Sequence, residues 1–381
     1  MRTLFITKDF PPVVCGVGDY TYQLAKEFLR DNHAVSVLTA ETAKAVKEDM
    51  HVHAVIPSWS IACIPVILNV CKKEKPDLIL LQYVPYSFNK RGIPFWIIVL
   101  YLALKIKGYK IVTTFHEVGI RYTKNNIKRT ITSLCQFFIA KCIAKMSYKN
   151  ITSIDLYSGY LQKYSNEVYQ IPIGANILPV PIMEDVLNGL KNRIAPNNEF
   201  IISTFGTRIS DTILHTLAAL KKDQIPIKLV LLGNLPSKTK EHFHKLAQNL
   251  GIDKDIYVTG YLSENELFSW LKASSLFVLI EYVSEKGEGG ICTKSGSLAA
   301  AFAAGLPILG TKGDTTDAVF KNNENIFLIN DDTSLSIKKR IIEIIDDPEK
   351  LAHVSANAEI TFADFFSWDI IYKQYSDAIK K

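Results

Sequence analysis

Four loops of the chain combine glycine with charged or hydroxyl side chains, which are the residue types that bind oxyanions and sugars. The first loop contains Gly16, Val17, Gly18 and Asp19. Glycine lets the backbone approach a ligand closely, and a helix that starts here offers N–H groups to an anion. The third glycine of the dinucleotide fingerprint is missing, which argues against a Rossmann oxidoreductase. Two interpretations remain: Asp19 caps the helix, or it binds a hydroxyl-rich ligand.

The second loop places His116 and Glu117 directly after an apolar run that predicts a buried strand. A lone histidine beside a sheet is often structural. Its place at the carboxyl end of a parallel strand, where ligands of α/β proteins bind, favours a functional role. Glu117 and Asp19 are candidates to contact an acceptor or to assist its deprotonation.

The third loop contains Gly206, Thr207 and Arg208, again directly after an apolar run. The arginine guanidinium is planar and permanently charged, so it suits an anionic oxygen. The alternative is a solvated surface arginine.

The fourth loop, residues 285–307, is the richest. A glycine-rich stretch, which we expect to be flexible, leads into an alanine-rich helix. A helix start that carries a cation and hydroxyls binds phosphate through its N–H groups. The Walker spacing is absent, so this is not the loop of a nucleoside triphosphatase. The candidate residues are Glu288, Lys294, Ser295, Gly296, Ser297 and Leu298.

The apolar runs around these loops predict two doubly wound, Rossmann-like α/β domains that face each other across a cleft. We expect the first domain at residues 1–181, a polar linker at 182–198 and the second domain at 199–363. Ser263 and Glu266 predict a capping box at a helix start. The predicted strands are 3–6, 34–38, 51–56, 78–82, 110–114, 151–154, 168–171, 200–205, 227–232, 256–259, 276–280, 307–309 and 326–329.

Composition narrows the class of protein. A chain of 381 residues with 48% hydrophobic and 22% charged residues is not mainly disordered. The surplus of six positive charges contains no run of five like charges, so we expect no nucleic-acid partner. The six cysteines form no CxxC pair, which indicates neither a structural zinc site nor a redox motif and favours a reducing cytoplasm.

The longest apolar run, residues 93–104, is too short to span a membrane, which takes about 20 residues. One interpretation is a buried helix. The other is a partly exposed apolar helix that rests on a membrane, with Lys90, Arg91, Lys105 and Lys107 near the headgroups. Residues 128–149 repeat this character. We therefore expect a cytoplasmic protein, with peripheral contact at the inner face of the membrane as the second interpretation.

In this order the four loops resemble those of the GT-B glycosyltransferases. More narrowly, they are similar to the large retaining family that includes glycogen synthase and sucrose-phosphate synthase. The resemblance covers essentially the whole chain. The resemblance also rests on residues 81–86, 173–176, 231–234, 258–262 and the tail at 366–369.

The resemblance implies that the second domain binds a nucleotide-sugar donor and the first binds the acceptor. It implies that residues 364–381 form a helix that packs back on the first domain. His116 would lie beside the donor sugar and Gly16 to Gly18 would face the diphosphate. The remaining matches are Gly206, Thr207 and Arg208 near the diphosphate, Lys294 to Leu298 at the distal phosphate, and Gly260, Tyr261 and Leu262 at the base.

The paired glutamates of this family are absent, and Ala300 stands where the second one is expected. Glu288 is the carboxylate left to reach the sugar hydroxyls. Arg208, Lys294 and the helix start at Ser297 would stabilise the departing diphosphate, so we expect neither a metal nor a cofactor.

The predicted function is therefore sugar transfer from a nucleotide-diphosphate sugar to a glycan or lipid-linked acceptor. The resemblance implies retention of configuration and a role in bacterial-type surface polysaccharide assembly. Two alternatives stay open: a nucleotide-sugar epimerase on the same fold, and a non-catalytic sugar-nucleotide-binding subunit.

Overall fold

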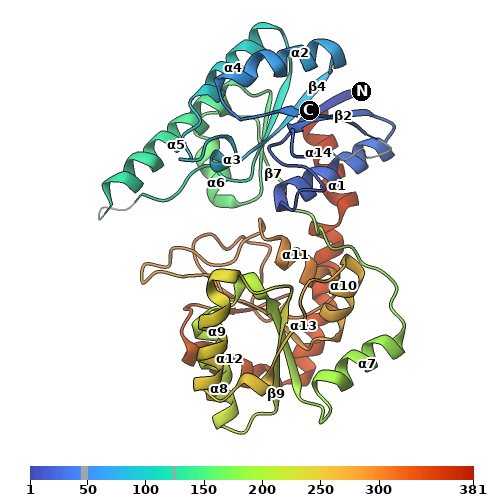
Figure 1. Ribbon diagram of the computed structural model, residues 1–381, viewed down its shortest axis with the longest axis vertical. Helices are drawn as coiled ribbons and strands as arrows, with labels where there is room; N and C mark the ends of the chain where they lie inside the picture. Colours follow the sequence, from blue (N-terminus) through green and yellow to red (C-terminus); the bar gives the residue numbers. More distant parts are fainter. Residues whose placement is uncertain (44–49, 123–125) are drawn as a thin grey trace. The chain divides into compact units, whose positions relative to one another are not determined.

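The computed structural model describes residues 1–43, 50–122 and 126–381, and it divides the chain into two compact units (Figure 1). The first unit consists of Met1–Asn176 together with Trp368–Lys381. The second unit consists of Ile177–Ser367. Each unit is built on its own sheet and is described separately.

The first unit contains a seven-stranded parallel sheet in the order β3-β2-β1-β4-β5-β6-β7. Its central strands β4 and β5 are buried at every residue, as in a parallel sheet covered by helices on both faces. The strands are β1 (Arg2–Ile6), β2 (Ala34–Ala40), β3 (His51–Ile56), β4 (Leu78–Tyr83), β5 (Ile111–Phe115), β6 (Lys149–Thr152) and β7 (Val168–Gln170). The helices are α1 (Gly16–Arg30), η1 (Ile61–Cys63), α2 (Ile64–Glu74), α3 (Pro85–Phe88), α4 (Trp96–Ile106), α5 (Ile127–Met146), α6 (Asp155–Leu161) and α14 (Trp368–Lys380).

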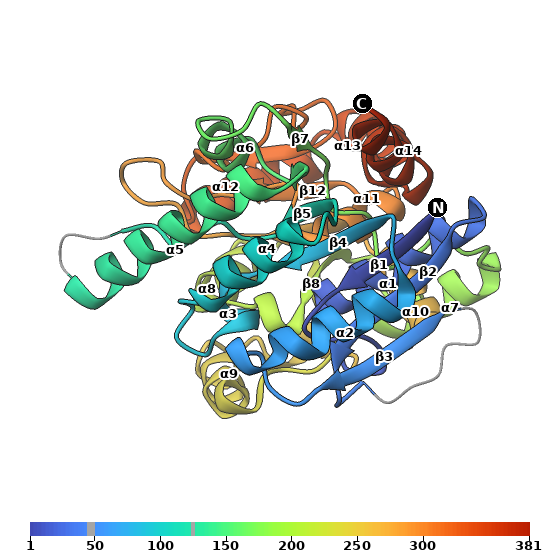
Figure 2. The same cartoon turned by 90° about the horizontal axis from the view of Figure 1, so that it is seen from above.

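The second unit contains a six-stranded parallel sheet in the order β10-β9-β8-β11-β12-β13. Its strands are β8 (Phe200–Phe205), β9 (Ile227–Leu232), β10 (Ile256–Val258), β11 (Leu276–Leu279), β12 (Ile308–Thr311) and β13 (Phe327–Ile329). Its helices are α7 (Glu184–Ile194), η2 (Gly206–Arg208), α8 (Asp211–Lys222), α9 (Ser237–Asn249), η3 (Asp253–Asp255), α10 (Glu264–Ala273), α11 (Gly296–Ala303), α12 (Ser334–Ile345), α13 (Pro348–Thr361) and the π-helical turn η4 (Phe362–Phe366). Figure 2 shows the same elements from above.

Two Rossmann-like α/β units were predicted and are confirmed, and each predicted strand overlaps a strand of the structure. Short runs rich in apolar and β-branched residues, which alternate with helical patterns, are typical of buried parallel strands. The capping box is also present, because the Ser263 side chain accepts from Glu266 N and the Glu266 side chain accepts from Ser263 N.

Residues 182–198, which we expected to be a linker, contain the helix α7 within the second unit. Their polar composition suggested a linker, but their charges are in an order that favours a helix. Glu184 and Asp185 lie in its first turn, whereas Lys191 and Arg193 lie in its last turn, which complements the helix dipole. The Arg193 guanidinium also lies 5.0 Å from the centre of the Tyr257 ring.

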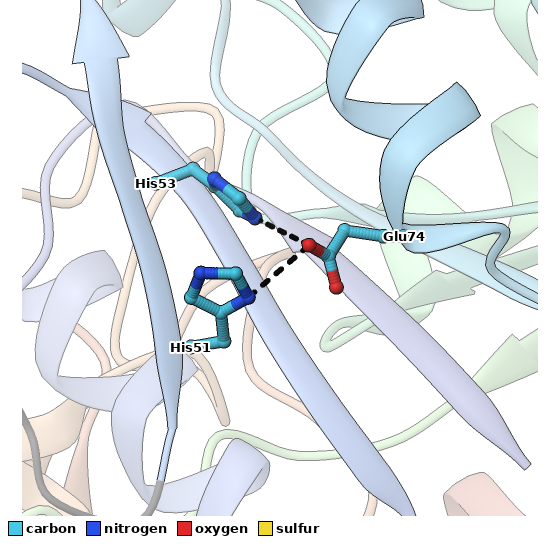
Figure 3. A group of neighbouring side chains, drawn as sticks. All are labelled: His51, His53 and Glu74. Carbon is cyan, nitrogen blue, oxygen red and sulfur yellow. Dashed lines mark hydrogen bonds and ion pairs between the residues drawn. The ribbon is translucent and has the colours of Figure 1, made fainter.

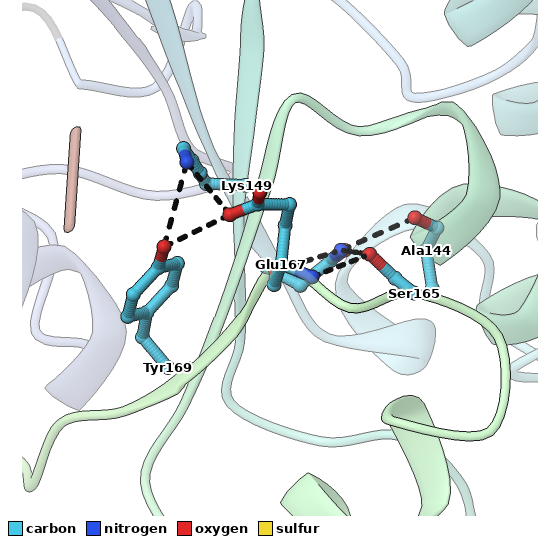
Figure 4. Close-up of polar contacts among 6 residues, drawn as sticks. Ala144, Lys149, Ser165, Glu167 and Tyr169 are labelled. Atoms are coloured by element: carbon cyan, nitrogen blue, oxygen red, sulfur yellow. Dashed lines mark hydrogen bonds and ion pairs between the residues drawn. The ribbon is translucent and has the colours of Figure 1, made fainter. Parts of the chain in front are cut away.

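A buried lysine joins β6 to β7 in the first unit (Figure 4). The Lys149 side chain is 2% exposed, and its Nζ lies 2.6 Å from Glu167 Oε2 and 3.4 Å from the Tyr169 hydroxyl. Loss of the Glu167 carboxylate would leave the buried ammonium of Lys149 without its charged partner, which is costly for a buried charge. This network is a structural feature of the sheet.

Candidate functional site

The predicted loops of the second unit all leave its sheet at the carboxyl edge. The strand order places the ends of β10, β9, β8, β11 and β12 side by side. Residues 206–208 follow β8, residues 260–262 follow β10, and the glycine-rich loop follows β11. Ligands of doubly wound sheets bind at this edge.

Arg208 forms an ion pair that the sequence did not predict. Its guanidinium donates to Glu281 Oε1 at 2.9 Å, and Glu281 lies just beyond the neighbouring strand β11. Both side chains are partly exposed, so the pair is worth only about 0–1 kcal/mol. Glu281 therefore orients Arg208 at the edge of the sheet, and an anion that takes the place of Glu281 loses little free energy in doing so.

The glycines that follow β8 and β10 allow close backbone contacts. A Cβ on Gly206 would lie 2.9 Å from the Asn234 carbonyl oxygen, which is closer than such atoms approach. Gly260 has φ +73°, a conformation that favours glycine, and forms an isolated bridge with Gly233. Between them these contacts fix the loops that carry the exposed Thr207, the half-buried Leu262 and the exposed Tyr261.

The glycine-rich loop, which we expected to be flexible, packs against residues 311–316. A Cβ on Gly289 would lie 2.0 Å from the Tyr282 carbonyl oxygen, and one on Gly290 would lie 2.5 Å from Gly313 N. The Thr315 hydroxyl donates to the carbonyl oxygens of Gly289 and Gly290. The glycines are needed because two backbone segments meet here with no room for a side chain.

The start of α11 carries the predicted phosphate-binding residues. Ser295 is the N-cap and its hydroxyl accepts from Leu298 N at 3.4 Å. Gly296 and Ser297 form the first turn and are half-buried, so their N–H groups lie at the helix entrance. Leu298 belongs to the core through its fully buried side chain, and its N–H serves the cap. Lys294 and Glu288 are exposed, whereas Ala300 is buried.

Asp317 is a supporting residue that sequence reasoning missed. Its Oδ2 accepts from Thr293 N at 2.8 Å and from Thr293 Oγ1 at 2.7 Å, and both residues are buried. These bonds fix the backbone directly before Lys294. No sequence signal links two positions that lie 24 residues apart.

In the first unit, α1 begins at Gly16 and its N-cap is Cys15. The interpretation of Asp19 as the capping residue is therefore wrong, because Asp19 lies within the first turns and is half-buried. A Cβ on Gly18 would lie 2.9 Å from the Asp9 carbonyl oxygen, so this glycine is required by packing. Gly16 is exposed with open space around it, and Val17 is half-buried.

His116 is buried at the end of β5 and is hydrogen-bonded to a neighbouring strand. Its Nε2 lies 2.8 Å from Gln82 Oε1, and its ring meets the edge of the Tyr20 ring at 5.1 Å between centroids. Because the amide oxygen of Gln82 can only accept, His116 donates from Nε2 in this hydrogen bond. Glu117 is half-buried beside it.

The C-terminal helix α14 packs against Tyr20, the residue whose ring contacts His116. The Tyr20 hydroxyl donates to the Tyr375 hydroxyl at 2.9 Å, and Tyr375 in turn lies 2.9 Å from Thr114 Oγ1. Trp368 Nε1 donates to the Ala175 carbonyl oxygen at 2.7 Å. Burial raises the pKa of Tyr375 to about 12, and it raises the pKa of Tyr20 as well, so both hydroxyls stay protonated. Sequence reasoning did not find this hydroxyl chain.

Two helices of the first unit expose matching rows of apolar side chains. In α4 and the residue before it these are Phe95, Val99, Leu102 and Ile106, and in α5 they are Ile127, Ile131, Leu134 and Phe138. Both rows have the spacing 4, 3, 4, which marks one face of a helix. The helices α4 and α5 pack together (Figure 2). The centres of the Phe95 and Phe138 rings lie 6.4 Å apart. We call these eight residues the apolar face.

Comparisons with known proteins agree with this architecture. The family model "Glycosyltransferase Family 4" matches residues 14–144, and the model "Glycosyl transferases group 1" matches residues 208–361. An uncharacterised glycosyltransferase of Methanocaldococcus jannaschii is 22% identical over 290 residues, which cover 74% of this chain and 71% of the relative.

Two solved structures share the fold over nearly the whole length. HepE of Anabaena, solved in complex with UDP, has a TM-score of 0.75 at 16% identity, with 100% of each chain covered. WaaG, a glycosyltransferase involved in lipopolysaccharide biosynthesis, has a TM-score of 0.67 at 15% identity, with 99% of this chain and 98% of WaaG covered.

The two Rossmann-like units define a GT-B fold. The chain belongs to the glycosyltransferases, with a family 4 domain in its first unit and a group 1 domain in its second. The resemblance inferred from the four loops is confirmed, and the protein is a glycosyltransferase enzyme.

Proposed function

We propose that this enzyme moves a sugar from a nucleoside-diphosphate sugar, held by the second unit, to a hydroxyl of a lipid-linked glycan at an anionic membrane surface. The observation that carries the donor assignment is the arrangement at the carboxyl edge of the second sheet. There Arg208 and Lys294 follow the neighbouring strands β8 and β11, and the first turn of α11 follows Lys294.

The chemistry of transfer calls for such an arrangement. When the sugar–phosphate bond breaks, negative charge develops on the departing diphosphate. Preorganised cations and helix N–H groups stabilise that charge. In this proposal Arg208 and Lys294 supply the cations and Gly296 and Ser297 the N–H groups, so transfer proceeds without a metal. Retention of configuration is part of the proposal on the ground of the family resemblance alone.

The other predicted residues are given supporting roles. Tyr261, Leu262 and Gly260 border the base, Gly206 and Thr207 border the diphosphate, and Glu288 binds the sugar hydroxyls. In the first unit, Gly16 to Gly18 face the donor, His116 lies beside the sugar, and Asp19 and Glu117 serve the acceptor. Because HepE was solved with UDP, uridine diphosphate sugars are the first donors to test.

The apolar face supports a membrane-bound acceptor. Residues 86–149 contain twelve lysines and arginines and one acidic residue, Glu117, so this segment is more basic than the whole chain, whose surplus is six. Exposed apolar rows flanked by cations bind at an anionic lipid surface. No helix among the described residues is long and apolar enough to cross a membrane. The face therefore fits contact with one leaflet.

The proposal is tested by incubating the full chain with a panel of nucleotide sugars and a lipid-linked glycan extract in vesicles that contain phosphatidylglycerol. The expected result is nucleoside diphosphate release that requires the acceptor, a labelled glycolipid with the donor's anomeric configuration, and no loss of rate with a chelator. Isomerisation of the donor without acceptor would favour an epimerase. Donor binding without turnover across the acceptor panel would favour a non-catalytic subunit.

The membrane contact is tested separately by vesicle sedimentation. The double substitution I127Q/L134Q replaces two side chains that are 77% and 64% exposed, so it should leave the fold intact and abolish binding to phosphatidylglycerol vesicles. The matched control is Ile360→Gln, an exposed apolar residue of the second unit. Equal binding by I127Q/L134Q and the wild type would exclude the apolar face as the contact.

A further inference from the structure

Two histidines and a glutamate converge at one edge of the first sheet (Figure 3). His51 Nδ1 lies 3.1 Å from Glu74 Oε1, and His53 Nε2 lies 2.8 Å from the same oxygen. The two imidazole rings are 4.2 Å apart. Within the parts of the chain that the structure describes, this is the one group of three metal-ligating residues whose ligand atoms all lie within 4.8 Å of one another.

The fold accounts for this convergence. His51 and His53 are two positions apart on the edge strand β3, so their side chains lie on the same side of the sheet. Glu74 is the last residue of α2, the helix that crosses back before β4. The cluster therefore lies toward the amino ends of the strands, whereas the loops of the candidate site follow their carboxyl ends. We propose that His51, His53 and Glu74 bind a divalent transition-metal ion, with zinc as the expected occupant.

The ligand set and its spacing suit zinc. Zinc binds imidazole nitrogen and carboxylate oxygen at about 2.0–2.2 Å in a tetrahedral arrangement, which sets ligand atoms about 3.4 Å apart. The two nitrogens already lie 3.1 and 2.8 Å from Glu74 Oε1. Small side-chain rotations that move these nitrogens a few tenths of an ångström away from Glu74 Oε1 would make room for the ion.

The surroundings also favour a cation. Glu74 ends a helix, where the negative end of the helix dipole disfavours a carboxylate and favours positive charge. The His53 and Glu74 side chains are only 9% and 18% exposed, which limits their motion, whereas His51 is 56% exposed. The open side at His51 provides an entry path and room for water as the fourth ligand. The bound ion would tie the edge strand β3 to α2.

This site contains no cysteine, so the absence of a CxxC pair from the sequence says nothing about it. The pattern His-x-His on a strand is visible in the sequence, but the third ligand lies 21 residues after His53. Zinc can be bound by histidine and carboxylate alone, and cysteine spacing does not reveal such a site.

The test uses the full chain without a histidine tag, stripped with a chelator and then titrated with zinc or cobalt(II). The wild type should bind one ion per chain, its melting temperature should rise with zinc, and cobalt(II) should give the absorption of a four-coordinate site. His51→Ala and Glu74→Gln should each weaken binding at least tenfold. His242→Ala removes an exposed histidine 3.0 Å from Asp211 in the second unit and should leave binding unchanged.

The proposal is overturned if the wild type retains no zinc. It is also overturned if the double variant H51A/H53A binds zinc as tightly as the wild type while both keep the same circular dichroism spectrum. Because none of these readouts involves sugar transfer, their outcome is independent of the proposed donor and acceptor.

Discussion

His116 and Gln82 form a 2.8 Å hydrogen bond between two neighbouring strands of the first sheet. Gln82 is 1% exposed, and its Nε2 has no hydrogen-bond partner among the described residues. A buried donor without a partner costs about 1–3 kcal/mol. Gln82 therefore carries a stability cost in order to hold the histidine in one orientation, which marks it as a positioning residue.

Replacing Gln82 with leucine separates these two effects. The substitution Gln82→Leu removes the unpaired amide but also leaves the buried Nε2–H of His116 without its acceptor, so the two effects on the free energy of unfolding should largely offset each other. The transfer rate should fall by about 10²-fold, because His116 loses the contact that orients it. Chemical denaturation and kcat measurements test both statements. A variant with a normal kcat would show that His116 does not depend on Gln82.

Arg208 and Lys294 should be needed for the departure of the diphosphate. Arg208→Ala and Lys294→Ala should each lower kcat/KM by about 10²–10³-fold with the fold intact, because each removes a cation from the developing charge. The control is Lys286→Ala, which removes an exposed cation from the same glycine-rich loop. Steady-state kinetics that place all three variants near the wild-type rate would refute the assignment.

The order of the elements could be derived from the sequence, because stretches such as 78–81 and 229–232 are apolar throughout and predict buried strands. Individual contacts could not. Glu281 lies 73 residues from Arg208, and Tyr375 lies 261 residues from Thr114. The strand order brings Glu281 to Arg208, and the packing of α14 brings Tyr375 to Thr114; local patterns do not carry that information. The capping interpretation of Asp19 and the linker expected at residues 182–198 were wrong, because polar residues at helix starts look alike whether they cap, fill the first turn or link domains.

The docking of α14 on the first unit depends on a glycine. A Cβ on Gly174 would lie 2.9 Å from the Trp368 ring, so Gly174→Ala should destabilise the protein by about 1–3 kcal/mol. The matched control is Gly189→Ala, at an exposed position in α7 with open space around it. This change should stabilise the protein by up to about 1 kcal/mol, because alanine is the better helix former. Thermal denaturation of the two variants should give shifts of opposite sign.

Asp255 should contribute acid sensitivity to the second unit. Burial raises its pKa, but hydrogen bonds from Lys221 and Lys228, at 2.6 and 2.7 Å, outweigh this and lower the pKa overall. Its stabilising effect is therefore full above the ordinary aspartate pKa and is lost as pH falls through the lowered one. Asp255→Asn should be less stable than the wild type at pH 7. In urea denaturation the difference should shrink below about pH 4; a difference that grows there would contradict the ion-pair assignment.

The central claim is that the second unit holds a nucleoside diphosphate through Lys294 and the start of α11. It is tested most directly by isothermal titration of the wild type and Lys294→Ala with uridine, guanosine, adenosine and thymidine diphosphates. The account predicts saturable binding of one of these nucleotides by the wild type and at least tenfold weaker binding by Lys294→Ala, with Lys286→Ala unchanged. Equal affinity of Lys294→Ala and the wild type, or no binding of any of the four, would contradict it.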